Sequence, residues 1–440
     1  MESQPKIIVL DDDPTGSQTV HSCLLLTRWD VDTLVLGLQD QSPIFFVLTN
    51  TRSLPPAEAE SRTREVCQNL KQALAQVGVS EFLVVSRSDS TLRGHYPIET
   101  DAITAELGPF DAHFLVPAFF EGGRFTRDSI HYLVIEGEPT PVHKTEFAQD
   151  SVFGYHHSYL PDYVAEKTAG QIGADQVERF VLADVRGGCL ERLLGLQENC
   201  CGVVDAETQA DLDHFAQDVL SAASQGKRFL FRSAASLLTA LAKLPPQPVA
   251  ATEMGQYVRQ GQLGAFLVGS HVQKTTTQLE PLLTAEGTAG IEVVLAELVT
   301  QPEVYGALRD QVLAQVYQVY EAGKTPVIYT SRQELTFADT ETRLQFGLTV
   351  SALLMEIVQG LPPTLGYLVS KGGITSNDVL STGLNLRAAR LLGQILPGCS
   401  VVRTPRNHPR FPDLPVVLFP GNVGDREALV MTYRRLSALH

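Results

Sequence analysis

Short apolar runs alternate along the N-terminal half of the chain with longer stretches in which apolar residues recur at helical spacing. The apolar runs predict buried strands at Ile7–Leu10, Cys23–Leu26, Ile44–Leu48, Phe82–Val85 and Phe114–Val116. The helical spacing occupies Pro56–Leu74 and Ile98–Leu107. Strands that alternate with helices in this order predict an α/β domain built on a doubly wound sheet.

The alternation weakens in the middle of the chain and then breaks. Residues 140–180 are rich in His, Tyr and Gly, and we expect them to be irregular. Strands are expected to resume at Phe180–Leu182, Val203–Val204 and Phe229–Phe231. Prolines are dense at Leu244–Pro248, which favours an extended connector over helix or strand. We therefore place a domain boundary at this connector.

A second α/β series follows the connector. It begins with a strand at Ala265–Ser270 and continues with a helix near Glu303–Ala322, a strand at Val327–Tyr329 and a helix at Leu344–Val358. A chain of 440 residues is long for one hydrophobic core, so we expect two domains. The predicted division is an N-terminal domain at 1–243, a linker at 244–262 and a C-terminal domain at 263–440. Each domain is expected to be a mostly parallel sheet flanked by helices, with the active site in the cleft between them.

The composition of the chain excludes several kinds of binding partner. The formal net charge of −16 argues against nucleic acid or an anionic membrane surface, because basic patches bind both. Six cysteines are scattered without a CxxC spacing, which indicates a reducing compartment and no zinc site. No run of about 18 apolar residues predicts a membrane span, and Met1–Lys6 leads into the first strand without room for a signal peptide. We expect a cytoplasmic protein that binds small molecules, and a homo-oligomer stays open.

Three polar loops follow predicted strands of the N-terminal half, at Asp11–Gly16, Thr49–Arg52 and Ser86–Gly94. The carboxyl ends of the strands in a doubly wound sheet meet at one edge, and ligands bind there. We therefore expect these loops to converge on one site.

The acid cluster in the first loop allows two functional interpretations. In a haloacid-dehalogenase-type phosphatase, Asp11 would be the nucleophile and Asp13 the acid/base. Alternatively, Asp12 and Asp13 bind hydroxyl groups of a substrate, and one of them accepts a proton. A purely structural role, in which the carboxylates cap the next helix, is also consistent with the composition of the loop. Three successive acids repel one another, however, and a site explains that cost better than a cap does.

Two glycine-rich turns follow buried strands near the C-terminal end, at Leu368–Ser376 and Val417–Asp425. Glycine lets the main chain approach a ligand closely, and the N-terminus of a following helix offers unpaired N–H groups to an anion. Lys371 stands beside the first turn. No G-x-x-x-x-G-K-(S/T) sequence is present, so the site is not of the Walker type. The two turns predict phosphate binding, and with the acid-rich N-terminal half they favour a two-lobed phosphoryl-transfer enzyme.

Several further segments form an ordered set with these features. Residues 87–94 read R-S-D-S-T-L-R-G, and the segments Pro117–Phe119, Gly123–Thr126 and Thr145–Asp150 follow. In the C-terminal half, Gly269-Ser270, Gly372–Thr375 and Gly421–Gly424 complete the set. With the opening Asp12–Gly16, the set resembles the motifs of the four-carbon acid sugar kinase family (DUF1537), over nearly the whole chain.

The resemblance implies an ATP-dependent kinase, with Mg²⁺, that phosphorylates a hydroxyl group of a small sugar acid such as threonate, erythronate or an oxo-tetronate. Such a substrate needs guanidinium groups for its carboxylate and carboxylates for its hydroxyl groups. We assign catalysis to Asp12 and Asp13, and substrate binding to Asp89, Ser90, Arg93, Arg87 and Arg124. Nucleotide binding is assigned to Ser270, Lys371, Gly372, Gly373, Ile374, Thr375, Gly421 and Asn422, and no protein ligand of the metal is assigned.

The chain departs from the family pattern at a few positions of the nucleotide loops. The family commonly has an acid where Ile374 stands, small residues where Asn377-Asp378 stand, and a smaller residue where His271 stands. These departures bear on the metal ligands and on the substrate, and the altered loop 372–378 is the hint for the second of two alternatives to the kinase. One is the phosphatase that uses Asp11 and Asp13, and the other is a non-catalytic sensor that binds a sugar acid.

Overall fold

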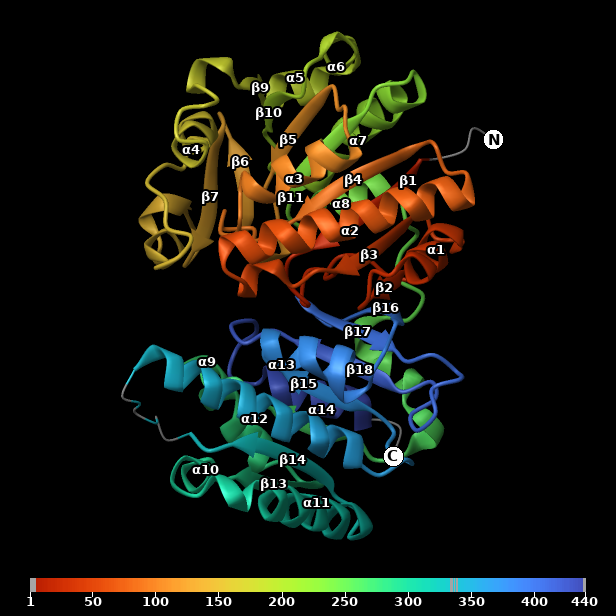
Figure 1. Ribbon diagram of the computed structural model, residues 1–440, viewed down its shortest axis with the longest axis vertical. Helices are drawn as coiled ribbons and strands as arrows, with labels where there is room; N and C mark the ends of the chain where they lie inside the picture. The colour runs from red at the N-terminus through yellow and green to blue at the C-terminus, as the bar shows by residue number, and fades with distance from the viewer. Residues whose placement is uncertain (1–4, 333–334, 336, 338, 438–440) are drawn as a thin grey trace. The chain divides into compact units, whose positions relative to one another are not determined.

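The computed structural model describes residues 5–437 except 333, 334, 336 and 338, so Met1–Gln4 lie outside the described residues. The chain divides into two compact units, Met1–Pro246 and Gln247–His440 (Figure 1). Most of the segment expected as a linker belongs to the second unit, where Ala251–Tyr257 forms a 3₁₀ helix that contacts α14 (Ala428–Ser437). Among the described residues, no helix is both long and apolar enough to cross a lipid bilayer.

The first unit is built on a parallel sheet. Its strands, in spatial order, are β2 (Leu24–Leu26), β3 (Ile44–Leu48), β1 (Lys6–Asp11), β4 (Phe82–Arg87), β11 (Phe229–Ser233), β5 (Ala112–Val116), β10 (Cys200–Val204) and β9 (Glu178–Phe180). Every residue of β1 after Lys6 is buried, and β3, β11 and β5 are buried throughout, as expected for a sheet that is covered on both faces.

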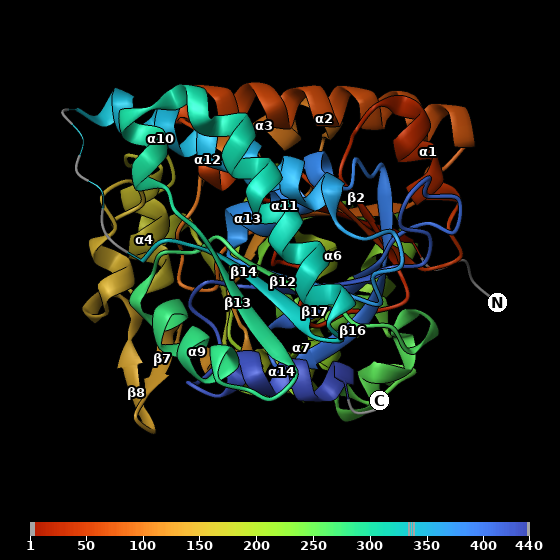
Figure 2. The ribbon, with the colours of Figure 1, turned by 90° about the horizontal axis from the view of Figure 1, so that it is seen from below.

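Helices cover both faces of this sheet. They are α1 (Val31–Gln39), α2 (Pro56–Val77), α3 (Ile98–Leu107), α4 (Leu160–Lys167), α5 (Leu182–Gly187), α6 (Leu190–Gly195), α7 (Gln209–Ser224) and α8 (Ala235–Ala242). Figure 2 shows α2 and α3 on one side of the strands and α7 on the opposite side. The core centres on Phe114, whose ring contacts the rings of Phe180, Phe215, Phe229 and Phe231.

Local sequence signals set the ends of the helices that flank the site. The side chain of Asp30 accepts a hydrogen bond from the Thr33 amide and caps α1. Pro56 occupies the first turn of α2, where no amide donor is needed, and α2 ends at Gly78, whose φ is +77°. The start of α2 fixes where the loop after β3 ends.

The expectation of an irregular segment at 140–180 is wrong in part. A small antiparallel sheet, made of β6 (Arg124–Arg127), β7 (Ile130–Ile135) and β8 (Glu138–Pro141), lies mostly before this segment and reaches only its first two residues. Helix α4 then forms because Leu160, Tyr163 and Val164 recur at helical spacing and are buried. The strand expected at Phe180–Leu182 ends at Phe180, and Leu182 begins α5.

The second unit contains a mixed sheet. Its strands, in spatial order, are β13 (Thr288–Val293), β14 (Thr325–Thr330), β12 (Ala265–Val268), β15 (Leu368–Lys371), β18 (Pro415–Phe419), β17 (Cys399–Arg403) and β16 (Ala388–Leu396). The first five are parallel, whereas β17 is antiparallel to both of its neighbours. The expected class, two α/β domains with mostly parallel sheets, is confirmed, although the strands β16 and β17 were not predicted.

Helices lie on both faces of the second sheet as well. They are α9 (Gln273–Leu283), α10 (Ala296–Thr300), α11 (Tyr305–Glu321), α12 (Thr340–Gly360), α13 (Gly373–Asp378) and α14. In Figure 2, α11 and α12 lie on one side of the strands β12–β14, and α9 and α14 lie on the other. The two glycine turns differ, because α13 follows Gly372 at once whereas α14 begins only at Ala428.

Candidate active site

The three polar loops of the first unit converge because their strands are neighbours. Strand β1 lies between β3 and β4, and the backbone pairing continues past the strand ends. The Asp12 amide donates to the Arg87 carbonyl at 3.2 Å, and the Thr49 amide donates to the Asp11 carbonyl at 2.9 Å. The side chains that follow these strands are therefore held at one edge of the sheet.

Arg52 lies at the centre of the acid cluster. Its Nη2 and Nε contact the two carboxylate oxygens of Asp12 at 2.7 and 3.2 Å. Its Nη1 lies 3.4 Å from Asp13 Oδ2 and 3.9 Å from Asp89 Oδ1. One guanidinium group thus lies between three carboxylates that come from two loops, and with Arg87 and Arg93 nearby it offsets their mutual repulsion.

Asp12 and Asp13 differ in what they offer to a ligand. The Asp12 side chain is 2% exposed, and the Asp13 side chain is 22% exposed. Asp13 Oδ1 accepts hydrogen bonds from the Thr15 amide at 2.7 Å and from the Thr15 hydroxyl, while Oδ2 faces Arg52. Burial alone would raise the pKa of Asp13, but Arg52 and Arg87 hold it below its ordinary value. Asp13 is therefore an accessible, ionised carboxylate.

Asp11 has a different environment. It is fully buried, and burial raises its pKa to about 8 against the opposing effect of Arg87, whose Nη1 lies 3.5 Å from Asp11 Oδ1. A side chain at Gly16 would overlap the Asp11 carboxyl group, so Gly16 closes over it. At neutral pH this group is a protonated, enclosed acid, which is a poor nucleophile.

Asp89 and Arg93 form a pair that is supported by a later segment. Arg93 Nε donates to Asp89 Oδ2 at 2.8 Å. Arg93 Nη1 lies 3.7 Å from Asp150 Oδ2, and the guanidinium carbon lies 4.9 Å from the centre of the Phe147 ring. Burial opposes ionisation of Asp89, yet Arg52 and Arg93 hold its pKa well below the ordinary value. The segment Thr145–Asp150 therefore positions Arg93 through both Phe147 and Asp150.

The remaining substrate-side candidates lie around this pair. Arg87 is 5% exposed, contacts Asp11, and leaves its Nε without a hydrogen-bond partner among the described residues. The Ser90 carbonyl accepts a hydrogen bond from His131 Nε2 at 2.8 Å. Arg124 is half-buried on β6 and makes no ion pair among the described residues, and burial lowers its pKa. Its Nη1 donates to the Gly122 carbonyl, and its buried Nε has no partner within the described part of the chain.

A further buried ion pair joins Arg232 and Glu99. Arg232 Nη1 contacts Glu99 Oε2 at 2.7 Å, and Thr51 donates to the other Glu99 oxygen at 2.5 Å. Gly94 has φ of +120°, and a side chain there would lie 2.5 Å from Arg232 Nη2 and 3.1 Å from Asp12 Oδ2. Only glycine permits this approach, so the end of the loop Ser86–Gly94 packs closely against Arg232 and Asp12.

In the second unit the three glycine-containing loops also come together. A side chain at Gly269 would meet Thr375 Oγ1 at 2.3 Å, and one at Gly421 would meet Ser270 Oγ at 3.1 Å. The Thr275 hydroxyl donates to Ser270 Oγ at 3.0 Å and contacts the Gly421 carbonyl at 3.1 Å. The ends of β12, β15 and β18 therefore form one compact group of small and hydroxyl-bearing residues.

Lys371 occupies a different place from the one expected for a phosphate ligand. It is fully buried, and its Nζ donates to the carbonyls of Pro420 and Gly421 at 2.5 and 3.2 Å. Nζ also lies 4.2 Å from the centre of the Phe419 ring. Burial lowers the pKa of Lys371 to about 7. In this conformation Lys371 ties the loop after β15 to the loop after β18.

The other nucleotide-side candidates border this group. Gly372 has φ of +121°, and Gly373 begins α13. Ile374 is 67% exposed, and Asn422 is exposed. Within the described residues, no group of three or more His, Cys, Asp or Glu side chains is arranged to hold a metal ion.

Sequence reasoning missed Arg52 as a site residue, although it placed the loop Thr49–Arg52 correctly at the sheet edge. It also missed Glu99 and Arg232, which are distant in sequence and meet only in the fold. The sequence did contain a signal for Arg52. Three neighbouring carboxylates require a cation nearby, and a loop that follows an adjacent strand could supply it.

Comparison with known families and structures is consistent with this geometry. A family model described as a sugar-binding N-terminal domain matches residues 7–241, and one described as a nucleotide-binding C-terminal domain matches residues 265–429. By fold, the chain is similar to a putative tRNA synthase from Salmonella typhimurium (TM-score 0.71, 19% identity, 98% and 99% of the two chains). It is also similar to a Haemophilus influenzae protein of the DUF1537 family (TM-score 0.65, 17% identity, 98% and 100% of the two chains).

Curated relatives are similar over different lengths. The chain is 26% identical over 399 residues to a D-erythronate kinase of Heliobacterium modesticaldum, covering 83% of each chain. It is 28% identical over 191 residues to a D-threonate kinase of Bordetella bronchiseptica, covering 41% of this chain and 45% of the relative.

Proposed function

The chain belongs to the four-carbon acid sugar kinase family, and we propose that it transfers the γ-phosphoryl group of ATP to a hydroxyl group of a small sugar acid. The sugar acid binds to the first unit and the nucleotide to the second. D-Erythronate and D-threonate, the substrates named for the two kinases, are the first candidates. The expectations that the site lies between the domains and that the protein is cytoplasmic stay predictions, and the oligomeric state stays open.

The observation that carries the proposal is the Arg52-centred acid cluster beside an arginine without a carboxylate partner. Asp13 and Asp89 are partly exposed and ionised, so they can accept hydrogen bonds from substrate hydroxyl groups. Arg124 makes no ion pair among the described residues, and the charges of Asp89 and Arg93 both influence its pKa. A molecule with several hydroxyl groups and one carboxylate satisfies both halves of this arrangement.

Asp13 is the residue assigned to the reacting hydroxyl. Its exposed carboxylate can orient the hydroxyl group and accept the proton as the oxygen attacks the phosphorus atom. Asp12 is bound on both oxygens by Arg52, so it positions Arg52 and is not assigned a proton-transfer role. Arg93, which binds Asp89 through Nε and Asp150 through Nη1, is assigned to substrate binding as well.

The loops after β12, β15 and β18 are assigned to the phosphate groups. The lack of side chains at Gly269, Gly372 and Gly421 lets Ser270 and Thr375 pack against these loops, and Ser270 and Thr375 supply hydroxyl groups. Lys371 positions these loops through Pro420 and Gly421. Mg²⁺ is part of the proposal, and it would be held mainly by the phosphates and water, as is usual for this ion, where it neutralises phosphate charge.

The phosphatase and sensor alternatives gain no support. A phosphatase needs Asp11 as an accessible nucleophile, whereas Asp11 is enclosed and protonated at neutral pH. An enzyme assay separates the alternatives: the purified protein is supplied with ATP, Mg²⁺ and single sugar acids of four carbons, and ADP formation is followed. ADP formation that depends on one of these acids supports the kinase. If the folded protein formed no ADP with any of these acids, the kinase proposal would be contradicted.

Replacement of Arg124 tests the substrate carboxylate site. Arg124→Lys keeps the charge but loses the two-pronged geometry, so KM for the sugar acid should rise by about tenfold, the effect of losing about 1.4 kcal/mol. The affinity for ADP should not change. Arg127→Lys is the matched control on the same strand, because Arg127 is half-exposed and pairs with Glu207. An unchanged KM for Arg124→Lys, measured in the ADP-forming assay, would remove Arg124 from the substrate site.

A further inference from the structure

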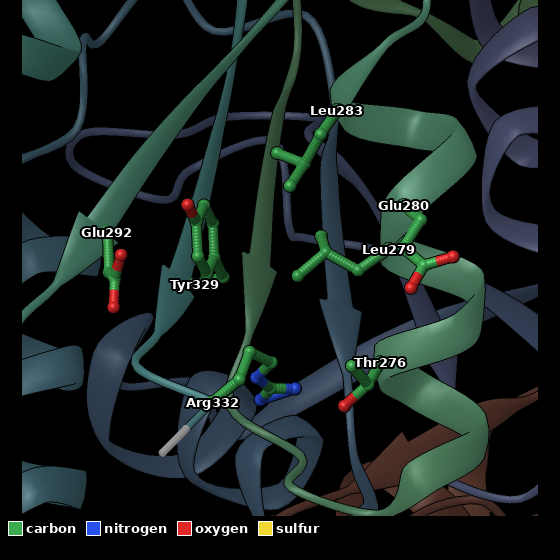
Figure 3. Close-up of a pocket in the computed structure, with 7 residues that line it drawn as sticks. All are labelled: Thr276, Leu279, Glu280, Leu283, Glu292, Tyr329 and Arg332. Atoms are coloured by element: carbon green, nitrogen blue, oxygen red, sulfur yellow. The ribbon is translucent and has the colours of Figure 1, made fainter.

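A cavity in the second unit lies between α9 and the strands β13 and β14 (Figure 3). Arg332 on its wall donates to the Ser270 carbonyl at 2.7 and 2.6 Å, so the cavity adjoins the loops already assigned to the nucleotide. The buried polar groups that neither proposed site uses lie elsewhere, in the middle of the chain.

Three successive carbonyl groups of the loop Ser86–Gly94 each accept a hydrogen bond from a buried side chain of the segment 131–163. The bonds run from His131 Nε2 to Ser90, from the Tyr155 hydroxyl to Thr91 and from the Tyr163 hydroxyl to Leu92, at 2.8, 2.7 and 2.8 Å. The donors come from β7, from the loop before α4 and from α4 itself. Three separate elements therefore hold one short stretch of backbone.

The middle of this stretch has a conformation that its side chain disfavours. Leu92 has φ of +67°, in the left-handed region that a leucine rarely adopts. Its amide donates to the Asp89 carbonyl at 3.2 Å, and its side chain is buried in the same apolar cluster as Tyr155 and Tyr163. Such backbone persists only where the surrounding contacts hold it. The two tyrosines supply such contacts to both the side chain and the backbone of this turn.

The donors have the protonation states that these hydrogen bonds need. Burial lowers the pKa of His131 to about 4, so its ring is neutral at pH 7. The Thr126 hydroxyl lies 3.0 Å from Nδ1 and can donate to it, which assigns the ring proton to Nε2, beside the Ser90 carbonyl. Burial raises the pKa values of Tyr155 and Tyr163 above the ordinary value, so both hydroxyl groups keep their protons.

The held backbone lies between two side chains of the proposed substrate site. Asp89 precedes it and Arg93 follows it, and the two are joined through Arg93 Nε and Asp89 Oδ2 at 2.8 Å. The Thr91 amide also donates to Asp89 Oδ2, at 3.3 Å. Rotation of the peptide groups of residues 90–92 would turn Asp89 and Arg93 away from each other.

We propose that His131, Tyr155 and Tyr163 are positioning residues for sugar-acid binding. They hold the backbone of residues 90–92, so that Asp89 and Arg93 keep the arrangement that the substrate meets. This role rests on the proposed function, because it takes these two side chains as ligands of the sugar acid.

Removal of the two tyrosine hydroxyl groups tests this role in the full-length protein. The double variant Tyr155→Phe/Tyr163→Phe keeps both rings, but two buried carbonyls lose their donors. KM for the sugar acid should rise by about tenfold, because only part of the protein then has the loop in its binding-competent conformation. The kcat value and the Kd of ADP should stay near those of the wild type. Hydrogen–deuterium exchange of the loop Ser86–Gly94 should become faster.

Tyr96→Phe is the matched control. Tyr96 is buried in the same cluster, and the centre of its ring lies 6.1 Å from that of Tyr163. Its hydroxyl contacts His113 and Cys201, and it holds no carbonyl of the loop within the described part of the chain. Both KM and the exchange of the loop should therefore stay at their wild-type values.

Two substitutions of His131 test the third donor. His131→Gln keeps an N–H group for the Ser90 carbonyl, whereas His131→Leu removes it. KM for the sugar acid should therefore rise in His131→Leu and lie nearer the wild-type value in His131→Gln. Equal KM values in these two variants would remove His131 from the positioning role.

The other outcomes separate this role from the proposed function. An unchanged KM in the folded double variant, or in both single variants if the double variant does not fold, would overturn the role and leave the kinase untouched. A rise of the same size in Tyr96→Phe, or an equal rise in the Kd of ADP, would also overturn it, since the hydroxyl groups would then support the fold in general. A wild-type protein that forms no ADP with any four-carbon acid would overturn the proposed function and this role with it.

Discussion

Asp13→Asn is expected to lower kcat by about 10²–10⁴-fold, the usual contribution of a general base, while the Kd of ADP stays the same. The substitution keeps the shape of the side chain and its contact with Thr15, but it removes the accessible negative charge next to Arg52. Steady-state ADP formation gives kcat, and calorimetry gives the Kd.

Asp11→Asn is the matched control. Asp11 is buried and protonated at neutral pH, so an amide of the same size should change kcat much less. A phosphatase would show the reverse order, because loss of its nucleophile would abolish activity. If Asp11→Asn were the more damaging of the two, Asp13 would lose its catalytic assignment.

Arg52→Met should lower the free energy of unfolding by about 3–5 kcal/mol, the usual cost of removing one partner from a buried ion pair. The Asp12 carboxylate is 2% exposed and would be left without its bidentate partner, and Asp13 and Asp89 would lose a shared counter-charge. The midpoint of urea unfolding, compared with that of the wild type, measures the change.

Two further variants make this result specific. Arg64→Met removes another arginine that contacts two carboxylates, but these contacts lie at the surface of α2, and stability should change little. Arg52→Lys keeps a charge without the bidentate contact, so its stability should fall between those of the wild type and Arg52→Met. Equal stability of Arg52→Met and wild type would show that the acid cluster does not depend on Arg52.

The fold was predictable where the pattern was strong. Strands such as β3 and β18 are apolar at nearly every position because both faces of a parallel sheet are covered, and that pattern is visible in the sequence. Helix α4 was missed because it is short and its four buried residues lie in a segment rich in turn-forming residues. The antiparallel strands β16 and β17 form a hairpin across Pro397-Gly398, so the missed signal was local: a two-residue turn between two apolar runs.

The location of the site could be predicted from the sequence better than the roles of its individual residues. Strand-end loops placed Asp12, Asp13 and Asp89 at one edge, and the structure brings them within reach of one guanidinium group. Which arginine pairs with which carboxylate depends on distances across the sheet, and the sequence carries no information on them. The burial of Lys371 was hidden for the same reason, since its position at the end of β15 is equally compatible with a phosphate ligand and a loop tie.

Transfer of label from ATP tests the central claim most directly. The wild-type protein is incubated with Mg²⁺, ATP labelled in the γ-phosphoryl group and D-erythronate or D-threonate, and the label is located by mass spectrometry. We predict that it appears on the sugar acid, with one ADP formed for each phosphorylated acid. The account would be contradicted if no acid of four carbons acquired the label, or if a phosphorylated substrate, without ATP, left a phosphoryl group on Asp11.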